Sequence, residues 1–249
     1  MMLNRITALA GMTLALLVAC AGTSPTMSRD QAAAIVASPD RTAADRENDA
    51  RRNPVDLLAF IDPRPGMTAL DISAARGYTT ELIARAVGPT GTVIGQSPMP
   101  ANGNAAPPPA FAERQKNPNL ANMKFVRRPF EDPVPPEFKG KLDLVTLMFN
   151  YHDMGHLRVD RAKLNRSVYE GLKPGGMFVI ADHSGRPGTG ISESGTLHRI
   201  EEAFLVKEVE AAGFKLAARG DFLANPQDPR DQAEPPFHKD EFVLKFVKP

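Results

Sequence analysis

The sequence predicts an α/β fold built on a doubly wound, mostly parallel sheet. Short apolar runs suited to buried strands recur along the chain, and the strongest are 142–149 and 177–183. Helical spacing of apolar residues marks 78–87, which lies between two further strand-like runs, 68–73 and 92–97. These three stretches form one strand–helix–strand unit, for which we expect a right-handed crossover.

Further elements continue this alternation to the end of the chain. The predicted strands are 123–129, 214–222 and 241–249, and the predicted helices are 161–172 and 199–213. A helix-like stretch over 41–62 precedes the sheet, with Pro54 starting its second half. The chain of 249 residues is long enough for one α/β domain.

Composition and charge limit the possible partners. A content of 42% hydrophobic and 24% charged residues is typical of a soluble globular protein. The 30 basic and 29 acidic side chains give a net charge of +1, so nucleic acid is not an expected partner. The absence of Trp also argues against a stacking platform for single strands. A small molecule is the expected substrate, and the oligomeric state is not indicated.

The first 20 residues are predicted to be a signal peptide rather than part of the fold. Arg5 precedes an apolar run over 6–19, which is too short to span a bilayer of ~30 Å as a helix. The run ends in Leu-Val-Ala-Cys over 17–20, which resembles the bacterial lipoprotein box. An ordinary signal peptide with an incidental Cys20 is the alternative.

This interpretation sets the expected organisation and location of the chain. We predict a lipoprotein signal peptide over 1–20, a tether over 21–42 and one domain over 43–249. The protein would then lie in the cell envelope on the periplasmic side, anchored to the membrane by a lipid on Cys20. Because Cys20 is the only cysteine, an exported chain has no intramolecular disulfide to form.

Several sequence stretches carry a resemblance to a known family. They are GMTALDISAARGYTTELIARAVGPTGTVIGQSP, LDLVTLMFNYHD, LKPGGMFVIADHS and EVEAAGF. Over about residues 50–249 the chain resembles the class I S-adenosylmethionine-dependent methyltransferases, and more closely an uncharacterised exported group of predicted methyltransferases. The resemblance implies a Rossmann-like seven-stranded sheet with 241–248 antiparallel. It also implies S-adenosyl-L-methionine across the carboxyl ends of 68–73 and 92–97.

The turn after the first strand departs from the family pattern. Asp71 is present, but Ser73 and Ala75 stand where the family has glycine, and only Gly77 remains. Ser73 and Ala75 each add a Cβ where the amino-acid part of the cofactor would lie, and we expect them to exclude positive φ angles. Gly77 still permits tight packing of strand and helix.

A second departure lies at the end of the second strand. The family has a carboxylate there for the ribose hydroxyls, whereas this chain has Ser97, preceded by Gln96. Replacing a charge-assisted bond by a neutral one weakens binding by roughly 1–3 kcal/mol. We expect Asn150 to belong to the cofactor site, and Glu131 or Asp132 to meet the adenine region unless both are solvated loop acids.

Polar clusters follow the two most apolar strands. Tyr151 and His152 follow one, and Asp182 and His183 end the other. Ligands of open α/β sheets bind at the carboxyl ends of strands, so these four are the predicted catalytic residues, with a histidine as general base. His198 is expected on the same side.

Other interpretations of these residues stay open. A metal site could be built from His152, His183, His198 and a carboxylate, but the spacing matches no fixed metal motif, so no metal is predicted. The same groups could simply hydrogen-bond to loop backbone. The segment 185–197, rich in Gly and Ser, is a candidate lid.

Two functions follow from these observations, besides a metal-dependent enzyme on the His152, His183 and His198 cluster. The first is methyl transfer from S-adenosylmethionine to a small molecule, with Asp71, His152 and His183 around one cavity. The second is a non-catalytic, exported ligand-binding protein on the same fold. The second explains Ser73, Ala75 and Ser97 together with export, because S-adenosylmethionine is made in the cytoplasm.

Overall fold

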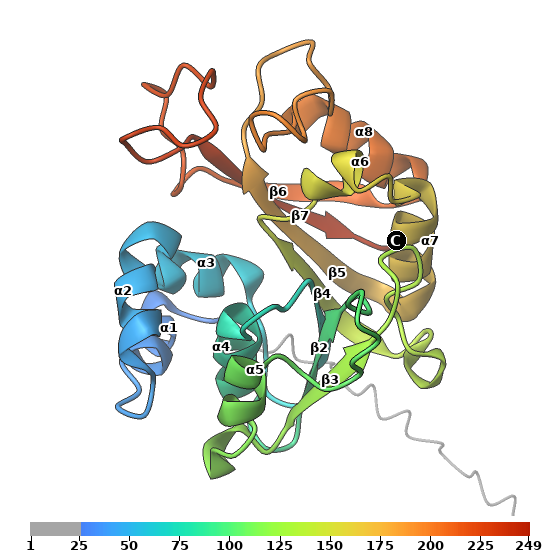
Figure 1. The fold of residues 1–249 in the computed structure, drawn as a ribbon. Coiled ribbons are helices and arrows are strands. Elements are labelled where there is room, and N and C mark those ends of the chain that lie inside the picture. The colour runs from blue at the N-terminus through green and yellow to red at the C-terminus, as the bar shows by residue number, and fades with distance from the viewer. Residues whose placement is uncertain (1–25) are drawn as a thin grey trace, which may run out of the picture.

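A seven-stranded sheet forms the centre of the computed structural model, which describes residues 26–249 (Figure 1). The strands are β1 (Thr68–Ile72), β2 (Thr92–Ser97), β3 (Met123–Arg127), β4 (Leu142–Met148), β5 (Leu172–His183), β6 (Lys215–Gly220) and β7 (Glu241–Val247). Their order is β3-β2-β1-β4-β5-β7-β6, and β7 runs antiparallel to both of its neighbours. The predicted fold class is confirmed, including the antiparallel C-terminal strand.

Helices cover both faces of the sheet (Figure 1). They are α1 (Arg29–Val36), α2 (Ala43–Arg52), α3 (Pro54–Ile61), α4 (Tyr78–Val87), α5 (Pro109–Arg114), α6 (Asp153–His156), α7 (Arg161–Gly171) and α8 (Glu202–Ala211), with 3-10 turns η1 (Pro118–Leu120) and η2 (Pro136–Phe138). Side chains alternate along each strand. Ala69 of β1 therefore packs with α3 and α4, while Leu70 and Ile72 pack with α7 and α8.

Two helix boundaries differ from the predicted ones. The stretch over 41–62 divides at Asn53, whose φ of 41° ends α2, and Pro54 begins α3. The helix expected from residue 199 begins at Glu202. Its first residues are used in pairing instead, because the N–H of Ile200 donates to the carbonyl of His183 at 3.1 Å.

The folded domain begins earlier than predicted. Residues 29–36, expected within a tether, form α1, and Ala32 of this helix is fully buried against Leu58 and Leu82. The N–H of Met27 donates to Asp62 Oδ1 at 2.7 Å. The tether prediction is therefore wrong for this segment, because burial gives it a fixed place on α3 and α4. The signal peptide and Cys20 lie outside the described residues.

Within residues 26–249, no helix has the length and apolar character needed to cross a membrane.

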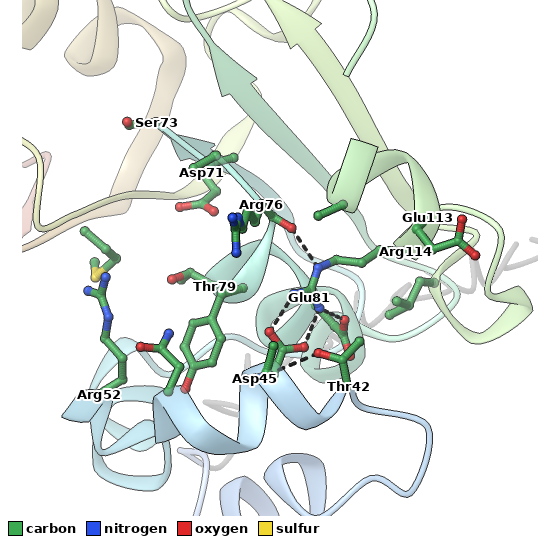
Figure 2. A pocket seen from close by; sticks show the side chains of 18 of the residues that line it. Thr42, Asp45, Arg52, Asp71, Ser73, Arg76, Thr79, Glu81, Glu113 and Arg114 are labelled. Carbon is green, nitrogen blue, oxygen red and sulfur yellow. Dashed lines mark hydrogen bonds and ion pairs between the residues drawn. The ribbon is translucent and has the colours of Figure 1, made fainter. Parts of the chain in front are cut away.

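Ion pairs fix α2 over the tip of the sheet (Figure 2). Arg114 of α5 binds Asp45 of α2 at 2.6 Å and also pairs with Glu81 of α4. The three side chains are only 8%, 7% and 4% exposed, respectively, so their charges are largely shielded from water. Burial by itself raises the pKa of Asp45, but Arg114 outweighs it and holds that pKa below its usual value. The relative positions of α2, α4 and α5 thus depend on the guanidinium of Arg114.

We expect Arg114→Gln to destabilise the domain by about 3 kcal/mol, because removing one partner leaves the other charges buried without compensation. Urea unfolding at neutral pH measures the change. The control is Lys116→Gln, whose ion pair with Glu113 is 72% exposed on both sides and contributes little. Equal stability of the two variants would contradict a structural role for this ion-pair network.

Candidate functional site

A cavity of about 970 Å³ opens at the carboxyl ends of β1 and β4 (Figure 2). Its walls are the turn over 73–76, the start of α4, parts of α2 and α5, and residues 148–150 at the end of β4. Its size lies at the upper end of the range for small-molecule sites. No residue of β2 or β3 lines it, so the cavity joins the tips of β1 and β4 rather than those of β1 and β2.

The turn after β1 keeps an unusual backbone. Ser73, Ala75 and Gly77 have φ angles of 59°, 46° and 82°, respectively. The expectation that Ser73 and Ala75 exclude positive φ is therefore wrong, although each non-glycine residue in this region costs roughly 1–2 kcal/mol. Gln96 of β2 holds the turn, because its Oε1 accepts the N–H of Ser73 at 3.1 Å and its carbonyl accepts that of Ala74 at 2.8 Å. Such backbone strain is typical of ligand-binding sites.

Gly77 is required for close packing of a helix on the start of α4, rather than for the expected packing of strand and helix. A Cβ at this position would lie 2.8 Å from the ring of Phe111 on α5. Gly95 on β2 faces the same ring, and a Cβ there would come within 2.5 Å of it. These two glycines allow α5 to lie close to the start of α4 and so shape one wall of the cavity.

Asp71 lies at the inner end of the cavity and is almost fully buried. Its carboxylate accepts hydrogen bonds from Thr80 of α4 at 2.6 Å and from Thr146 of β4 at 2.8 Å. Burial raises the pKa of Asp71 to about 6, against the opposing effect of these hydroxyls and of Arg52. A carboxyl group that is costly to ionise in the folded state is a recurrent feature of functional sites.

Arg52 is a second charged group of the cavity, and no motif in the sequence marks it. Its guanidinium carbon lies 3.8 Å from the centroid of the Phe149 ring, and its buried Nε has no hydrogen-bond partner. Burial lowers the pKa of Arg52 to about 10, and the neighbouring Arg51 adds to the effect. The side chain stays cationic at neutral pH and can pair with an anionic group of a ligand.

Three residues predicted for the cofactor, Gly77 among them, lie outside the cavity lining. Ser97, at the end of β2, is buried outside the cavity lining. Glu131, in the turn after β3, also lies outside it. Gln96 does not extend toward the cavity, since its Nε2 donates to the carbonyl of Arg128 at 2.6 Å. Among the predicted cofactor residues, Asp71, Ser73, Ala75 and Asn150 do line the cavity.

The predicted histidine cluster forms beside the cavity rather than in it. Asp182 accepts hydrogen bonds from His152 Nδ1 at 2.6 Å and from the N–H of His183 at 2.8 Å. The rings of His152 and His183 lie 5.4 Å apart. Phe149 lines the cavity and lies 5.5 Å from His183. The expectation that Asp71, His152 and His183 surround one cavity is therefore wrong, because neither histidine lines it.

The chemistry of His152 also differs from that of a general base. Burial alone lowers its pKa, but the carboxylates of Asp182 and Asp153 outweigh burial and raise the pKa to about 10. At neutral pH both ring nitrogens then carry a proton, and Nε2 must release its proton before it can act as a base or bind a metal ion. His183 has its Nδ1 3.0 Å from Glu241 Oε1, at the edge between β5 and β7.

Tyr151 lies in the hydrophobic core with α7 and α8. Its hydroxyl accepts a hydrogen bond from Asn165 at 2.8 Å and donates one to Glu208 at 3.1 Å. Burial raises its pKa above the ordinary value. These contacts hold Tyr151 away from the cavity and assign its hydroxyl to packing between helices.

The segment 185–197 packs over the histidines rather than over the cavity. Ser194 Oγ donates to the carbonyl of His152 at 2.6 Å and accepts the N–H of His156 at 2.8 Å. No sequence pattern marks this role of Ser194, because its contacts join residues about 40 positions apart.

We expect Asp71→Asn to stabilise the protein at pH 7.5 by roughly 3 kcal/mol. The pKa of Asp71 is raised in the folded state to about 6, so the folded chain resists ionisation. The wild type therefore loses stability as the pH rises from about 4 to about 6, and the gain of the variant vanishes below pH 4. Urea unfolding of both proteins at pH 7.5 and below pH 4 measures this difference in stability.

Exposed Glu137→Gln is the matched control and should give no gain at pH 7.5. A loss of stability in Asp71→Asn at pH 7.5 would show that the charged carboxylate is needed for folding.

Comparisons with known proteins support the fold more strongly than the activity. No protein-family model matches the chain. Curated demethylmenaquinone methyltransferases of Staphylococcus aureus strains are 31% identical over 139 residues, which cover 51% of this chain and 48% of the relative. The chain thus spans about half the length of the curated relatives it matches.

Solved structures resemble the chain over most of its length. A SAM-dependent methyltransferase from Aquifex aeolicus superposes with a TM-score of 0.60 at 15% identity, covering 90% of this chain and all of the other. The [4+2]-cyclase SpnF gives a TM-score of 0.60 at 17% identity, covering 83% and 82%, respectively. A SAM-dependent methyltransferase from Mesorhizobium loti gives 0.53 at 17%, covering 77% and 95%. The chain has the class I methyltransferase fold.

Proposed function

We propose that this protein is an S-adenosylmethionine-dependent methyltransferase that acts on a small molecule. The observation that carries the proposal is the cavity beside the turn after β1, whose backbone has positive φ at residues 73, 75 and 77. The methyltransferase fold of the solved relatives and the half-length match to demethylmenaquinone methyltransferases support it.

The residues of the cavity suit the methionine part of this cofactor. Asp71 offers a carboxylate near a cationic ligand, and Arg52 offers a cation near the ligand's carboxylate. The cofactor would supply an electrophilic methyl group. Phe149 and Asn150 would orient the reactants and exclude water from them. Holding reactants in the right geometry lowers the barrier to reaction. The nucleoside part finds less support, because Ser97 lies outside the cavity.

A non-catalytic ligand-binding protein is the second candidate. The engagement of Gln96 by the turn and the position of Ser97 favour it, because no described residue of β2 faces the cavity. The protonated state of His152 favours it too, since it removes the predicted general base. The similar structure SpnF is named as a [4+2]-cyclase, so this fold also occurs in a protein that is not named as a methyltransferase.

Calorimetry with S-adenosylhomocysteine tests the first candidate. We expect binding by the wild type and about tenfold tighter binding by the double variant Ser73→Gly, Ala75→Gly. Glycine removes both Cβ atoms from the cavity wall and relieves the strain of positive φ. The control is Ala69→Gly in β1, a core residue outside the cavity lining, which should lose stability without gaining affinity.

Absence of heat at millimolar ligand for the wild type and the double variant would contradict cofactor binding. Native mass spectrometry that finds a different ligand in the cavity would then favour the binding protein.

We also propose that the chain is exported and anchored in the cell envelope by a lipid on Cys20. The support is the sequence over 1–20 alone. Metabolic labelling with a radioactive fatty acid should mark the wild-type protein in a bacterial host and leave Cys20→Ser unlabelled. Equal labelling of both proteins, or of neither, would contradict the anchor.

A further inference from the structure

Three side chains beside the cavity bring potential metal ligands together. His152 Nε2 lies 3.1 Å from Asp153 Oδ1, and His198 Nδ1 lies 3.3 Å from the same oxygen. One ligand atom from each residue falls within 4.8 Å of the others. His152 and Asp153 follow β4, whereas His198 comes from the segment after β5, so only the fold unites them.

The surrounding contacts orient these ligand atoms. Asp182 binds His152 Nδ1 at 2.6 Å, which leaves Nε2 directed at Asp153. Asn150 Nδ2 donates to Asp153 Oδ2 at 2.6 Å, which leaves Oδ1 for the two histidines. A carboxylate behind a histidine is the usual support of a metal-bound imidazole. His198 has a φ of 53°, a backbone conformation that non-glycine residues adopt where the surrounding structure holds them.

We propose that His152, Asp153 and His198 bind a divalent transition-metal ion such as Zn²⁺. Two imidazoles and one carboxylate suit such ions, and three protein ligands leave a position open to water or a ligand. The side chains of Asp153 and His198 are 24% and 44% exposed, which gives an ion a path from solvent. Of the set considered from sequence, His183 is left out because its Nδ1 faces Glu241, and Asp153 supplies the carboxylate.

The site is separate from the cavity but linked to it. Asn150 lines the cavity with its backbone neighbour Phe149, and its amide holds Asp153. A bound ion would therefore lie one side chain away from a ligand in the cavity. The proposal does not depend on methyl transfer, and its test uses no S-adenosylmethionine.

Metal titration of the untagged full-length chain, freed of metal with a chelator, tests the proposal. Calorimetry with Zn²⁺ should show one ion bound per chain. The absorption spectrum of added Co²⁺ should show coordination by nitrogen and oxygen. We expect His198→Ala to weaken Zn²⁺ binding at least ~100-fold, since it removes one of three ligands. The exposed His238→Ala, outside the three-residue set, is the control and should bind as the wild type does.

Asp153→Asn gives a second test that does not alter a histidine, and it should weaken Zn²⁺ binding as well. Circular dichroism of each variant checks that the fold is kept. Lack of saturable binding by the wild type would overturn the proposal. Wild-type affinity in folded His198→Ala would overturn it equally, because the ion would then bind elsewhere.

Discussion

The hydrogen bonds of Asp71 are the constraint on which the candidate site depends. Its carboxylate joins three elements, because Asp71 lies in β1 and binds Thr80 of α4 and Thr146 of β4. The parallel register pairs Asp71 with Thr146, so the tips of β1 and β4 meet at the same edge. The cavity forms at this edge, and α2 closes one side of it through the ion pairs of Arg114.

Phe149 divides the edge of the sheet into two chemically different parts. Its φ of 57° turns the chain after β4, and its N–H donates to the carbonyl of Ala181 at 2.6 Å. On one side lies the cavity, with the buried acid Asp71 and the cation Arg52. On the other side lie the histidines, which are bound by Asp182 and covered by Ser194. The first part suits an organic ligand that carries a cationic and an anionic group. The second part holds the ligands of the proposed metal ion.

Much of the fold was predictable because local patterns are strong in buried parallel strands. The helix 78–87 and the strand 92–97 have the predicted bounds, since Gly and Pro end them on both sides. The site was less predictable. Asp71 and Asn150 line the cavity, but His152 and His183 do not, because sequence order does not reveal that the Phe149 ring lines the cavity and lies against His183. The place of α1 also depended on packing, as Ala32 carries no strong signal of its own.

By itself, the sequence determined the alternation of strands and helices, the antiparallel last strand expected from family resemblance, and the polar residues at the strand tips. Periodicity and chain punctuation act over a few residues, and so they can be read locally. Only the tertiary structure decided which of those polar residues share a cavity and how Ser73 and Ala75 hold positive φ. It also decided that His198 meets Asp153. These outcomes depend on contacts between distant segments, whose geometry is set by packing rather than by local sequence.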